Sequence, residues 1–306
     1  MSSNTHIKIG TRDSELAMWQ ANTVAELLKS HGYEVELFPV KSTGDLNLDQ
    51  PLYEMGITGI FTKTLDIALI KGEIDVAVHS MKDVPTQLPK TVVKAAVLPR
   101  ANSIDILLHK GTEFLSHKEG TIATGSLRRK AQWLHKYPTH QVKNLRGNVN
   151  TRLQKLADSK WNGAIFAAAG LERINLKPKT HIELDWMIPA PAQGAMLVVT
   201  TENNTFCQEA LSNLHHQATD DCVQIERDFL RQLEGGCTAP IGALAKIQED
   251  KIYFEGALFS LDGTEKFSIE KEFSYPLKGN EGKLAAEELL ANGAANLMRQ
   301  IKEQLA

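Results

Sequence analysis

The chain of 306 residues has only three cysteines and no long apolar run. Cys207, Cys222 and Cys237 are odd in number and lack the spacing of metal ligands, which argues against a disulfide framework and against a metal site. No stretch approaches the length of a membrane span, and the N-terminus lacks a basic region followed by an apolar run. We therefore expect a cytoplasmic protein with no secretory signal, no membrane contact and no metal.

The charge balance argues against a further class of partner. A net charge of −3 provides no general attraction to nucleic acid or to an anionic membrane surface. An apolar content of 42% with 23% charged residues is typical of a soluble globular enzyme. Since the length exceeds that of one ordinary hydrophobic core, we expect two or three domains.

The first two-thirds of the chain alternates short strands with helices. In the first part, strands are predicted at 6–10, 33–40 and 74–78, with a helix that begins at Asp13 or Ser14 and ends at Gly32, a loop at 41–59 and a helix from 61 to 72. In the second part, strands are predicted at 105–109, 121–124, 142–145, 163–169 and 195–200, with helices at 126–135 and 151–158. This order predicts mostly parallel sheets with helices on both faces, which bind ligands at the carboxyl ends of their strands.

The last third has a different pattern. A helix at 223–233 precedes three strands at 241–248, 252–260 and 267–274 and one long helix at 282–304. A run of strands followed by a helix indicates a small α+β domain.

Six arginines fall at predicted strand ends or in the first turns of helices. They are Arg12, Arg128, Arg129, Arg146, Arg152 and Arg173. A cation in the first turn of a helix opposes the helix dipole, and a bound anion would remove that conflict. Any one of them alone is typical of a solvated surface residue, but together they favour a site for a polyanion. That polyanion carries either phosphates or several carboxylates, and no nucleotide-binding glycine motif is present.

Two further residues are candidates for chemistry. Asp83, in the segment that leaves the strand at 74–78, is a carboxylate among cations and is suited to stabilising a positive charge on a substrate; the alternative is that it caps the turn before Pro85. Cys237 follows two glycines that leave its thiol accessible to act as a nucleophile or as an attachment point; the alternative is a helix that ends in a Gly-Gly turn. We interpret His79 as a satisfied structural histidine.

These segments closely resemble those of the porphobilinogen deaminase (hydroxymethylbilane synthase) family. The matching segments are 10–14, 42–45, 78–85, 126–129, 145–148, 150–153, 192–195 and 233–237, and the match runs in order from about residue 6 to residue 305. The resemblance implies two periplasmic-binding-protein-like (type II) α/β domains and a small C-terminal α+β domain that carries the cysteine. The implied boundaries are 1–98 with 195–217, 99–194, and 218–306.

The resemblance also implies an activity. A transferase of this kind joins four porphobilinogen molecules head to tail into hydroxymethylbilane with release of ammonia, as a step of tetrapyrrole (haem) biosynthesis. It builds the chain on a dipyrromethane cofactor attached to Cys237 by a thioether, and it is usually a monomer. A binding protein without enzymatic activity and an inactive relative remain the alternatives.

The resemblance assigns a role to each candidate residue. The residues implied to hold the cofactor are Ser80, Lys82, Thr124, Ser126, Arg128 and Arg129. Those implied to hold the incoming pyrrole and the growing chain are Arg12, Arg146, Arg152 and Arg173, with Asp83 as the catalytic carboxylate. Glu54 and Thr58 stand where relatives often have lysines, which puts in doubt the contact between a lid formed by the loop at 42–59 and the substrate. Gly125 stands where a serine is frequent.

Overall fold

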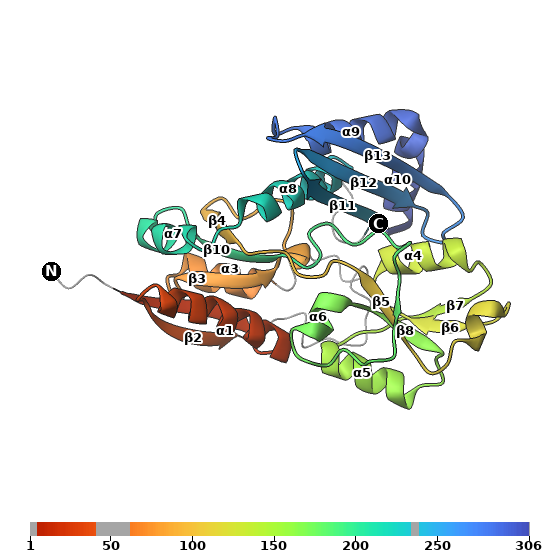
Figure 1. The fold of residues 1–306 in the computed structure, drawn as a ribbon, viewed down its shortest axis with the longest axis horizontal. Helices are drawn as coiled ribbons and strands as arrows, with labels where there is room; N and C mark the ends of the chain where they lie inside the picture. The colour runs from red at the N-terminus through yellow and green to blue at the C-terminus, as the bar shows by residue number, and fades with distance from the viewer. Residues whose placement is uncertain (1–4, 41–61, 234–238, 306) are drawn as a thin grey trace. The chain divides into compact units, whose positions relative to one another are not determined.

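The computed structural model describes residues 5–40, 62–233 and 239–305, which form two compact units (Figure 1). Among these residues, unit 1 comprises 5–40, 62–101 and 194–220, and unit 2 comprises 102–193, 221–233 and 239–305. The predicted loop at 41–59 with Glu54 and Thr58, and Cys237 with its glycines, lie outside the described residues. The division into three domains stays a prediction.

Unit 1 is built on a five-stranded sheet with the order β2-β1-β3-β10-β4. Its strands are β1 (His6–Arg12), β2 (Glu34–Val40), β3 (Val76–Ser80), β4 (Val92–Val97) and β10 (Met196–Thr201). β1 is parallel to β2 and β3, whereas β10 is antiparallel to both of its neighbours, so four strands run one way and β10 runs against them. The sequence predicted the position of β10 but not its direction, and it did not predict β4.

Helices cover both faces of this sheet, as expected. α1 (Glu15–Ser30) and α7 (Thr205–Ser212) share one core with Ile7 and Ile9, while Leu65 of α3 (Lys63–Ile70) lies against Gly10 on the other face. α1 begins where predicted, because Ser14 Oγ accepts a hydrogen bond from the N–H of Ala17 at 3.4 Å.

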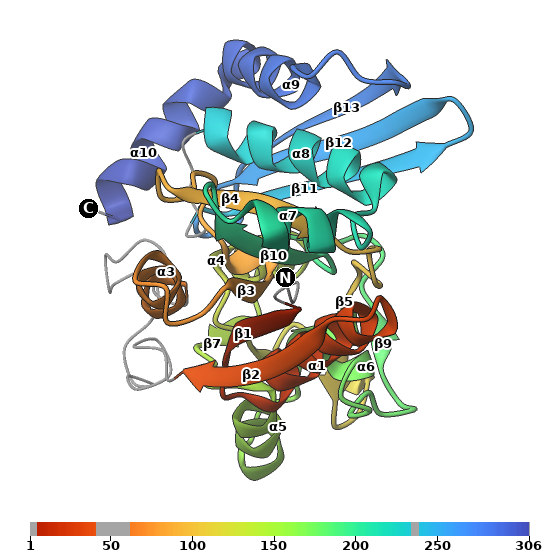
Figure 2. The same ribbon diagram turned by 90° about the vertical axis from the view of Figure 1, so that its left-hand side faces the viewer.

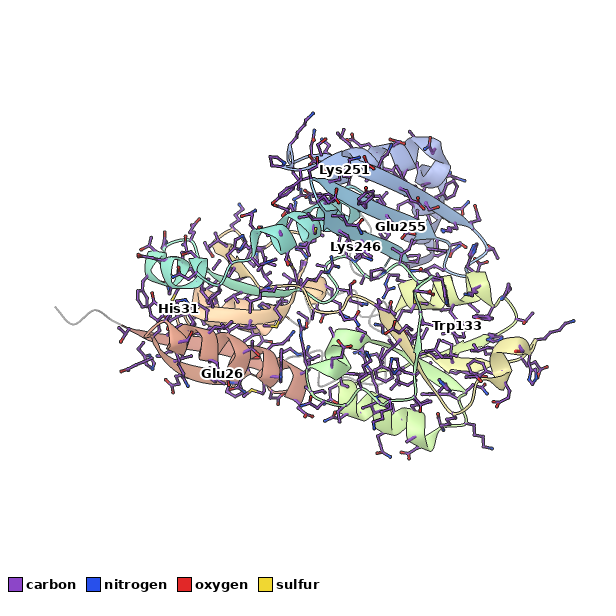
Figure 3. All side chains as sticks on the ribbon, viewed as in Figure 1. Glu26, His31, Trp133, Lys246, Lys251 and Glu255 are labelled. Atoms are coloured by element: carbon purple, nitrogen blue, oxygen red, sulfur yellow. The ribbon has the colours of Figure 1, made fainter. Side chains whose placement is uncertain are left out.

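Unit 2 contains a second five-stranded sheet that repeats the pattern of the first. Its order is β7-β6-β8-β5-β9, with β5 (Asp105–His109), β6 (Thr121–Ala123), β7 (Gln141–Lys143), β8 (Gly163–Ala167) and β9 (Ile182–Glu183). Here too the fourth strand in the order, β5, is antiparallel to its neighbours, while β6 is parallel to β7 and β8. The helices of this part are α4 (Leu127–Lys136), α5 (Val149–Asp158) and α6 (Ala168–Glu172). Its core includes Trp133 of α4, which is fully buried (Figure 3).

The C-terminal part of unit 2 packs helices on one face of an antiparallel sheet (Figure 2). The strands are β11 (Ile241–Gln248), β12 (Lys251–Phe259) and β13 (Lys266–Ser274), and the helices are α8 (Gln217–Gln232), α9 (Glu281–Leu289) and α10 (Ala295–Leu305). The prediction of a single long helix at 282–304 is wrong. The segment forms two helices, α9 and α10, which are separated by a π turn at Leu290–Ala294, where Gly293 has a φ of 110°.

Helix α4 is joined closely to this C-terminal sheet. Ala131 of α4 shares a small core with Ala257 and Phe259 of β12, and His135 Nδ1 lies 2.8 Å from the carbonyl oxygen of Gly263. The two mixed α/β sheets and the small α+β part confirm the α/β class with a C-terminal α+β addition that was expected from the sequence.

Candidate functional site

The predicted site residues fall in both units, near the carboxyl edge of each sheet. In unit 1, β3 ends at Ser80 and leads directly into a short 3-10 helix, Met81–Asp83. Ser80 Oγ is held by the buried side chain of Gln20, with 3.0 Å to Gln20 Nε2 and 3.3 Å to Gln20 Oε1. The end of this strand is therefore anchored to helix α1.

Asp83 is half-buried at the end of the short helix. Within the described part of the chain, its carboxylate takes part in no hydrogen bond or ion pair. The alternative in which Asp83 caps the turn before Pro85 therefore has no hydrogen bond to support it. A half-buried carboxylate without an internal partner has oxygens that remain available to a ligand.

Arg12 is the last residue of β1, and His79 is the residue before the last of β3. His79 is 6% exposed, and burial, together with the charge of Arg12, lowers the pKa of His79 to about 4. Its ring is therefore neutral at neutral pH. Its Nε2 has no hydrogen-bond partner among the described residues, so His79 is not the satisfied histidine that we expected, although its burial agrees with a structural role.

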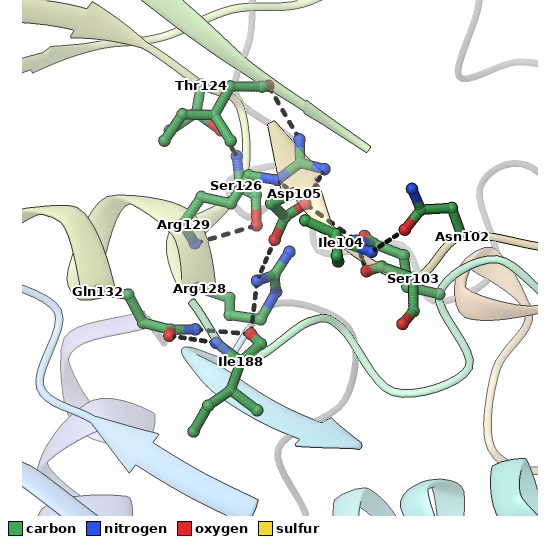
Figure 4. Close-up of polar contacts among 12 residues, drawn as sticks. Asn102, Ser103, Ile104, Asp105, Thr124, Ser126, Arg128, Arg129, Gln132 and Ile188 are labelled. Carbon is green, nitrogen blue, oxygen red and sulfur yellow. Dashed lines mark hydrogen bonds and ion pairs between the residues drawn. The ribbon is translucent and has the colours of Figure 1, made fainter. Parts of the chain in front are cut away.

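In unit 2, Arg128 and Arg129 are brought together by a residue that the sequence argument did not identify, Asp105 (Figure 4). Arg128 Nη1 lies 2.7 Å from Asp105 Oδ2, and Arg129 donates to Asp105 Oδ1 from Nη2 at 2.7 Å and from Nε at 3.0 Å. Asp105 is fully buried, and the two arginines are 4% and 6% exposed. A charged residue at the start of an otherwise apolar strand was the signal available in the sequence.

The charges of this cluster do not cancel. Burial alone would raise the pKa of Asp105, but the two guanidinium groups and the hydrogen bonds of Arg128 and Gln193 hold it well below its usual value. Burial lowers the pKa of Arg128, and the charge of Asp105 opposes that effect. Two cations and one anion leave one net positive charge. Arg128 Nε is in addition a buried donor without a hydrogen-bond partner among the described residues.

The turn before α4 presents this cluster at a helix N-terminus. Ser126 is the N-cap, with its Oγ 3.4 Å from the N–H of Arg129, and Thr124 Oγ1 accepts from the N–H of Ser126 at 3.2 Å. A Cβ on Gly125 would lie 2.5 Å from the carbonyl oxygen of Leu145, so the backbone approaches too closely for a side chain. The first turn of α4 contains no acidic residue that would balance its two arginines.

The remaining predicted arginines follow strands of the same sheet. Arg146 comes after β7 and is 4% exposed, and Arg152 in α5 donates from Nε to the carbonyl oxygen of Gly147 at 2.7 Å. Arg173 ends α6, directly after β8, and burial lowers its pKa to about 10. The structure therefore places the five predicted site arginines of unit 2 beyond strand ends of one sheet. It brings two of them, Arg128 and Arg129, onto one shared partner.

Comparisons with known proteins identify the family of this chain. The family described as "Porphobilinogen deaminase, dipyromethane cofactor binding domain" matches residues 7–209, and "Porphobilinogen deaminase, C-terminal domain" matches residues 221–291. The chain belongs to the porphobilinogen deaminase family. The porphobilinogen deaminase of Syntrophomonas wolfei is 38% identical over 304 residues, which covers 97% of this chain and 99% of its own length. That of Desulfitobacterium hafniense is 40% identical and covers 98% of each chain.

A solved structure has a similar fold, and the described residues contain neither a membrane-spanning helix nor a cluster of metal ligands. The crystal structure of the methionine binding protein MetQ is similar with a TM-score of 0.46 and 16% identity, covering 69% of this chain and 90% of that chain. Among the described residues, no helix has the length and apolar character needed to cross a membrane. Residues 5–40, 62–233 and 239–305 also contain no group of three or more histidine, cysteine, aspartate or glutamate side chains suited to a metal ion.

Proposed function

We propose that this member of the porphobilinogen deaminase family joins four porphobilinogen molecules head to tail into hydroxymethylbilane, with release of ammonia. The observation that carries the proposal is the buried cluster of Arg128, Arg129 and Asp105, because it retains one positive charge within the cofactor binding domain. The protein would do so as a cytoplasmic monomer, without nucleic acid, membrane or metal.

The residues present fit a dipyrromethane cofactor. The pyrrole rings of such a group carry acetate and propionate side chains, and the Arg128–Arg129–Asp105 cluster offers a net positive charge and an unused buried N–H at Arg128 Nε. The other residues proposed to hold the cofactor are Ser80, Lys82, Thr124 and Ser126, with the covalent attachment at Cys237. When bound, the cofactor supplies the terminal pyrrole to which each new unit is added.

Arginines are proposed to bind the incoming porphobilinogen and the growing chain. Guanidinium groups form two-pronged hydrogen bonds with carboxylates, which suits Arg12, Arg146, Arg152 and Arg173 to the two carboxylates of each unit. Hydrogen bonds to charged groups contribute about 1.5–3 kcal/mol each. Several such contacts and a covalent tether together would retain a partly built chain between successive additions.

Asp83 is proposed as the catalytic residue. Its carboxylate has no internal partner in the described part of the chain, so both oxygens are available to accept hydrogen bonds from pyrrole N–H groups. In that position it would stabilise the positive charge that develops when porphobilinogen loses its amine. It would also transfer the proton that the amine needs to leave as ammonia.

Intact-mass measurement tests the proposal. We expect active protein to be heavier than the bare polypeptide by two pyrrole units, and we expect the Cys237→Ser variant to have the bare mass and no activity. Cys207→Ser and Cys222→Ser are matched controls that should keep the added mass, because both thiols are buried in the cores of their units. Active wild-type protein with the bare mass would overturn the proposed attachment. Porphobilinogen that binds without release of ammonia would identify a binding protein instead.

A further inference from the structure

Asp105 is a buried charge to which the proposed chemistry gives no role. It is fully buried at the first position of β5, and it contacts three side chains, those of Arg128, Arg129 and Gln193. Burying a carboxylate is costly unless partners compensate it, and the removal of one partner leaves an uncompensated charge. A residue that requires this much compensation fixes the positions of the groups around it.

The direction of β5 explains how Asp105 reaches the arginines. Because β5 is antiparallel to β8, Asp105 pairs with Ala167, the last residue of β8. The carboxylate is therefore at the same edge of the sheet as the carboxyl end of β6, where Thr124 leads into α4. The start of one strand thus supplies the counter-ion for a helix that follows the end of another.

Each guanidinium group has a second fixed contact besides Asp105. Arg129 donates from Nη1 to the carbonyl oxygen of Ile165 at 3.1 Å, and Arg128 donates from Nη1 to that of Ile188 at 2.7 Å. These contacts fix the planes of both groups. Arg128 Nε is then left as a buried donor without a partner among the described residues.

Gln193 fixes the carboxylate of Asp105 in turn. The side chain of Gln193 is fully buried, and its Nε2 donates to Asp105 Oδ1 at 2.9 Å and to the carbonyl oxygen of Ser103 at 2.7 Å. Oδ1 therefore receives hydrogen bonds from both Gln193 and Arg129, and Oδ2 is left to Arg128. With this arrangement neither oxygen can exchange partners without breaking a buried contact.

We propose that Asp105 is a positioning residue for the cofactor. It holds Arg128 and Arg129 in a fixed geometry, and it reduces the charge of the cluster to one positive charge, which one carboxylate of the cofactor can balance. The proposal rests on the proposed function. Without Asp105, two buried guanidinium groups would face each other with like charge and without a common hydrogen-bond acceptor. The two guanidinium groups would move apart, which disrupts the binding geometry, or they would bind a solvent anion, which competes with a carboxylate of the cofactor.

The test measures how fast the cofactor is acquired. Apo-protein is incubated with porphobilinogen, and the fraction of chains carrying the two-pyrrole mass is followed by intact-mass measurement in wild type, Asp105→Asn and Asp105→Glu. We expect loading to be about 10- to 100-fold slower in Asp105→Asn, in line with the loss of hydrogen bonds to a charged group. We expect an intermediate rate in Asp105→Glu, which keeps the charge but displaces it. Asp228→Asn is the matched control, because Asp228 is a buried aspartate of the same unit that pairs with Arg231 instead.

Chemical rescue separates positioning from a general loss of stability. In Asp105→Ala, formate can occupy the vacated space and restore a carboxylate between the arginines, so added formate should accelerate loading in this variant and not in wild type. Loading at the wild-type rate in folded Asp105→Asn would overturn the proposal. If that variant does not fold, wild-type loading in Asp105→Glu would overturn it. Failure of the wild-type protein to gain the two-pyrrole mass would instead reject the proposed function.

Discussion

Asp105 and Ala167 lie directly opposite each other on neighbouring strands, so that the first residue of β5 is beside the last residue of β8. The corresponding strand of the other sheet, β10, is also antiparallel to its neighbours. In each sheet, this reversed strand contributes its first residues to the edge at which the other strands end. Residues that start such a strand are therefore as well placed for a ligand site as residues that follow the others.

The close contact between α4 and the C-terminal sheet predicts a strong effect of one glycine. Gly263 has a φ of 78°, and a Cβ there would collide with the carbonyl oxygen of Ala131 and lie 2.6 Å from the N–H nitrogen of His135. Gly279 has a φ of 93° with open space around it, which makes it a matched control. Gly279→Ala should lower the free energy of unfolding by about 1 kcal/mol through backbone strain alone. Gly263→Ala should lower it by a further 1–3 kcal/mol, roughly, through overpacking. Urea unfolding measures both, and equal losses would contradict the close contact.

Local signals in the sequence predicted most elements of the fold. Helix α1 was predicted with its N-cap at Asp13 or Ser14, of which the structure shows Ser14, and with its end at Gly32, because the residues that decide both ends lie within the segment itself. The break of the long C-terminal helix was missed, because one glycine in a helical pattern usually costs only about 1 kcal/mol. Here Gly293 adopts a φ of 110°, against Phe267, a residue of the neighbouring sheet that helical periodicity does not include.

The candidate site was predicted in part, for a similar reason. Arg128 and Arg129 were identified because they stand in the first turn of a predicted helix, which is a local signal. Asp105 and Gln193 were not identified as members of the cluster, since they are 24 and 88 residues from the side chains that they contact. Those contacts depend on the antiparallel direction of β5, and a strand pattern predicts a position along the chain but not a direction.

A pair of like charges on the C-terminal sheet predicts a stabilising substitution. Glu255 on β12 (Figure 3) pairs with Glu270 on β13. Burial raises the pKa of Glu255 and the charge of Glu270 adds to this increase, whereas the charges of Lys266 and Lys246 oppose it. A raised pKa in the folded state means that ionisation opposes folding as the pH rises above the usual range of a glutamate. Glu255→Gln should therefore increase the free energy of unfolding by about 0.5 kcal/mol at pH 7. The gain should disappear below about pH 4, where the carboxyl is protonated in both states.

Glu272 offers a control on the same strand as Glu270. It forms an ion pair with Lys251, with 2.6 Å between Oε1 and Nζ. Glu272→Gln removes an attraction and not a repulsion, so it should leave stability unchanged or slightly lower. An increase in the free energy of unfolding in Glu272→Gln equal to that in Glu255→Gln would show that the gain does not come from the Glu255–Glu270 pair.

The buried ring of His79 predicts a loss of stability in acid. Its pKa is lowered to about 4 in the folded state, against about 6.5 in an unfolded chain. As the pH falls from 6.5 to 4, the unfolded state gains a proton that the folded state does not bind, which favours unfolding. The cost corresponds to about 3 kcal/mol.

Comparison with His79→Leu isolates this contribution. The difference in stability between variant and wild type at pH 7 reports packing and the removal of the unpaired Nε2, because the histidine is mostly neutral in both states there. Between pH 7 and pH 4, the variant should gain about 3 kcal/mol relative to wild type in urea unfolding experiments. Parallel curves for the two proteins over this range would show that His79 is not held neutral by its surroundings.

Asp83 allows the most direct test of the proposed chemistry. Asp83→Asn keeps the shape of the side chain, and since the carboxylate has no partner in the described part of the chain, the melting temperature should be unchanged. The amide cannot accept or deliver the proton or balance a positive charge, so turnover of porphobilinogen should fall by about 100-fold or more. Asp66→Asn is the control, because Asp66 is also a half-buried aspartate of unit 1 but lies on helix α3. Near-normal release of ammonia by Asp83→Asn would remove Asp83 from the mechanism, whereas a parallel loss in Asp66→Asn would indicate a general effect of removing buried negative charge from this unit.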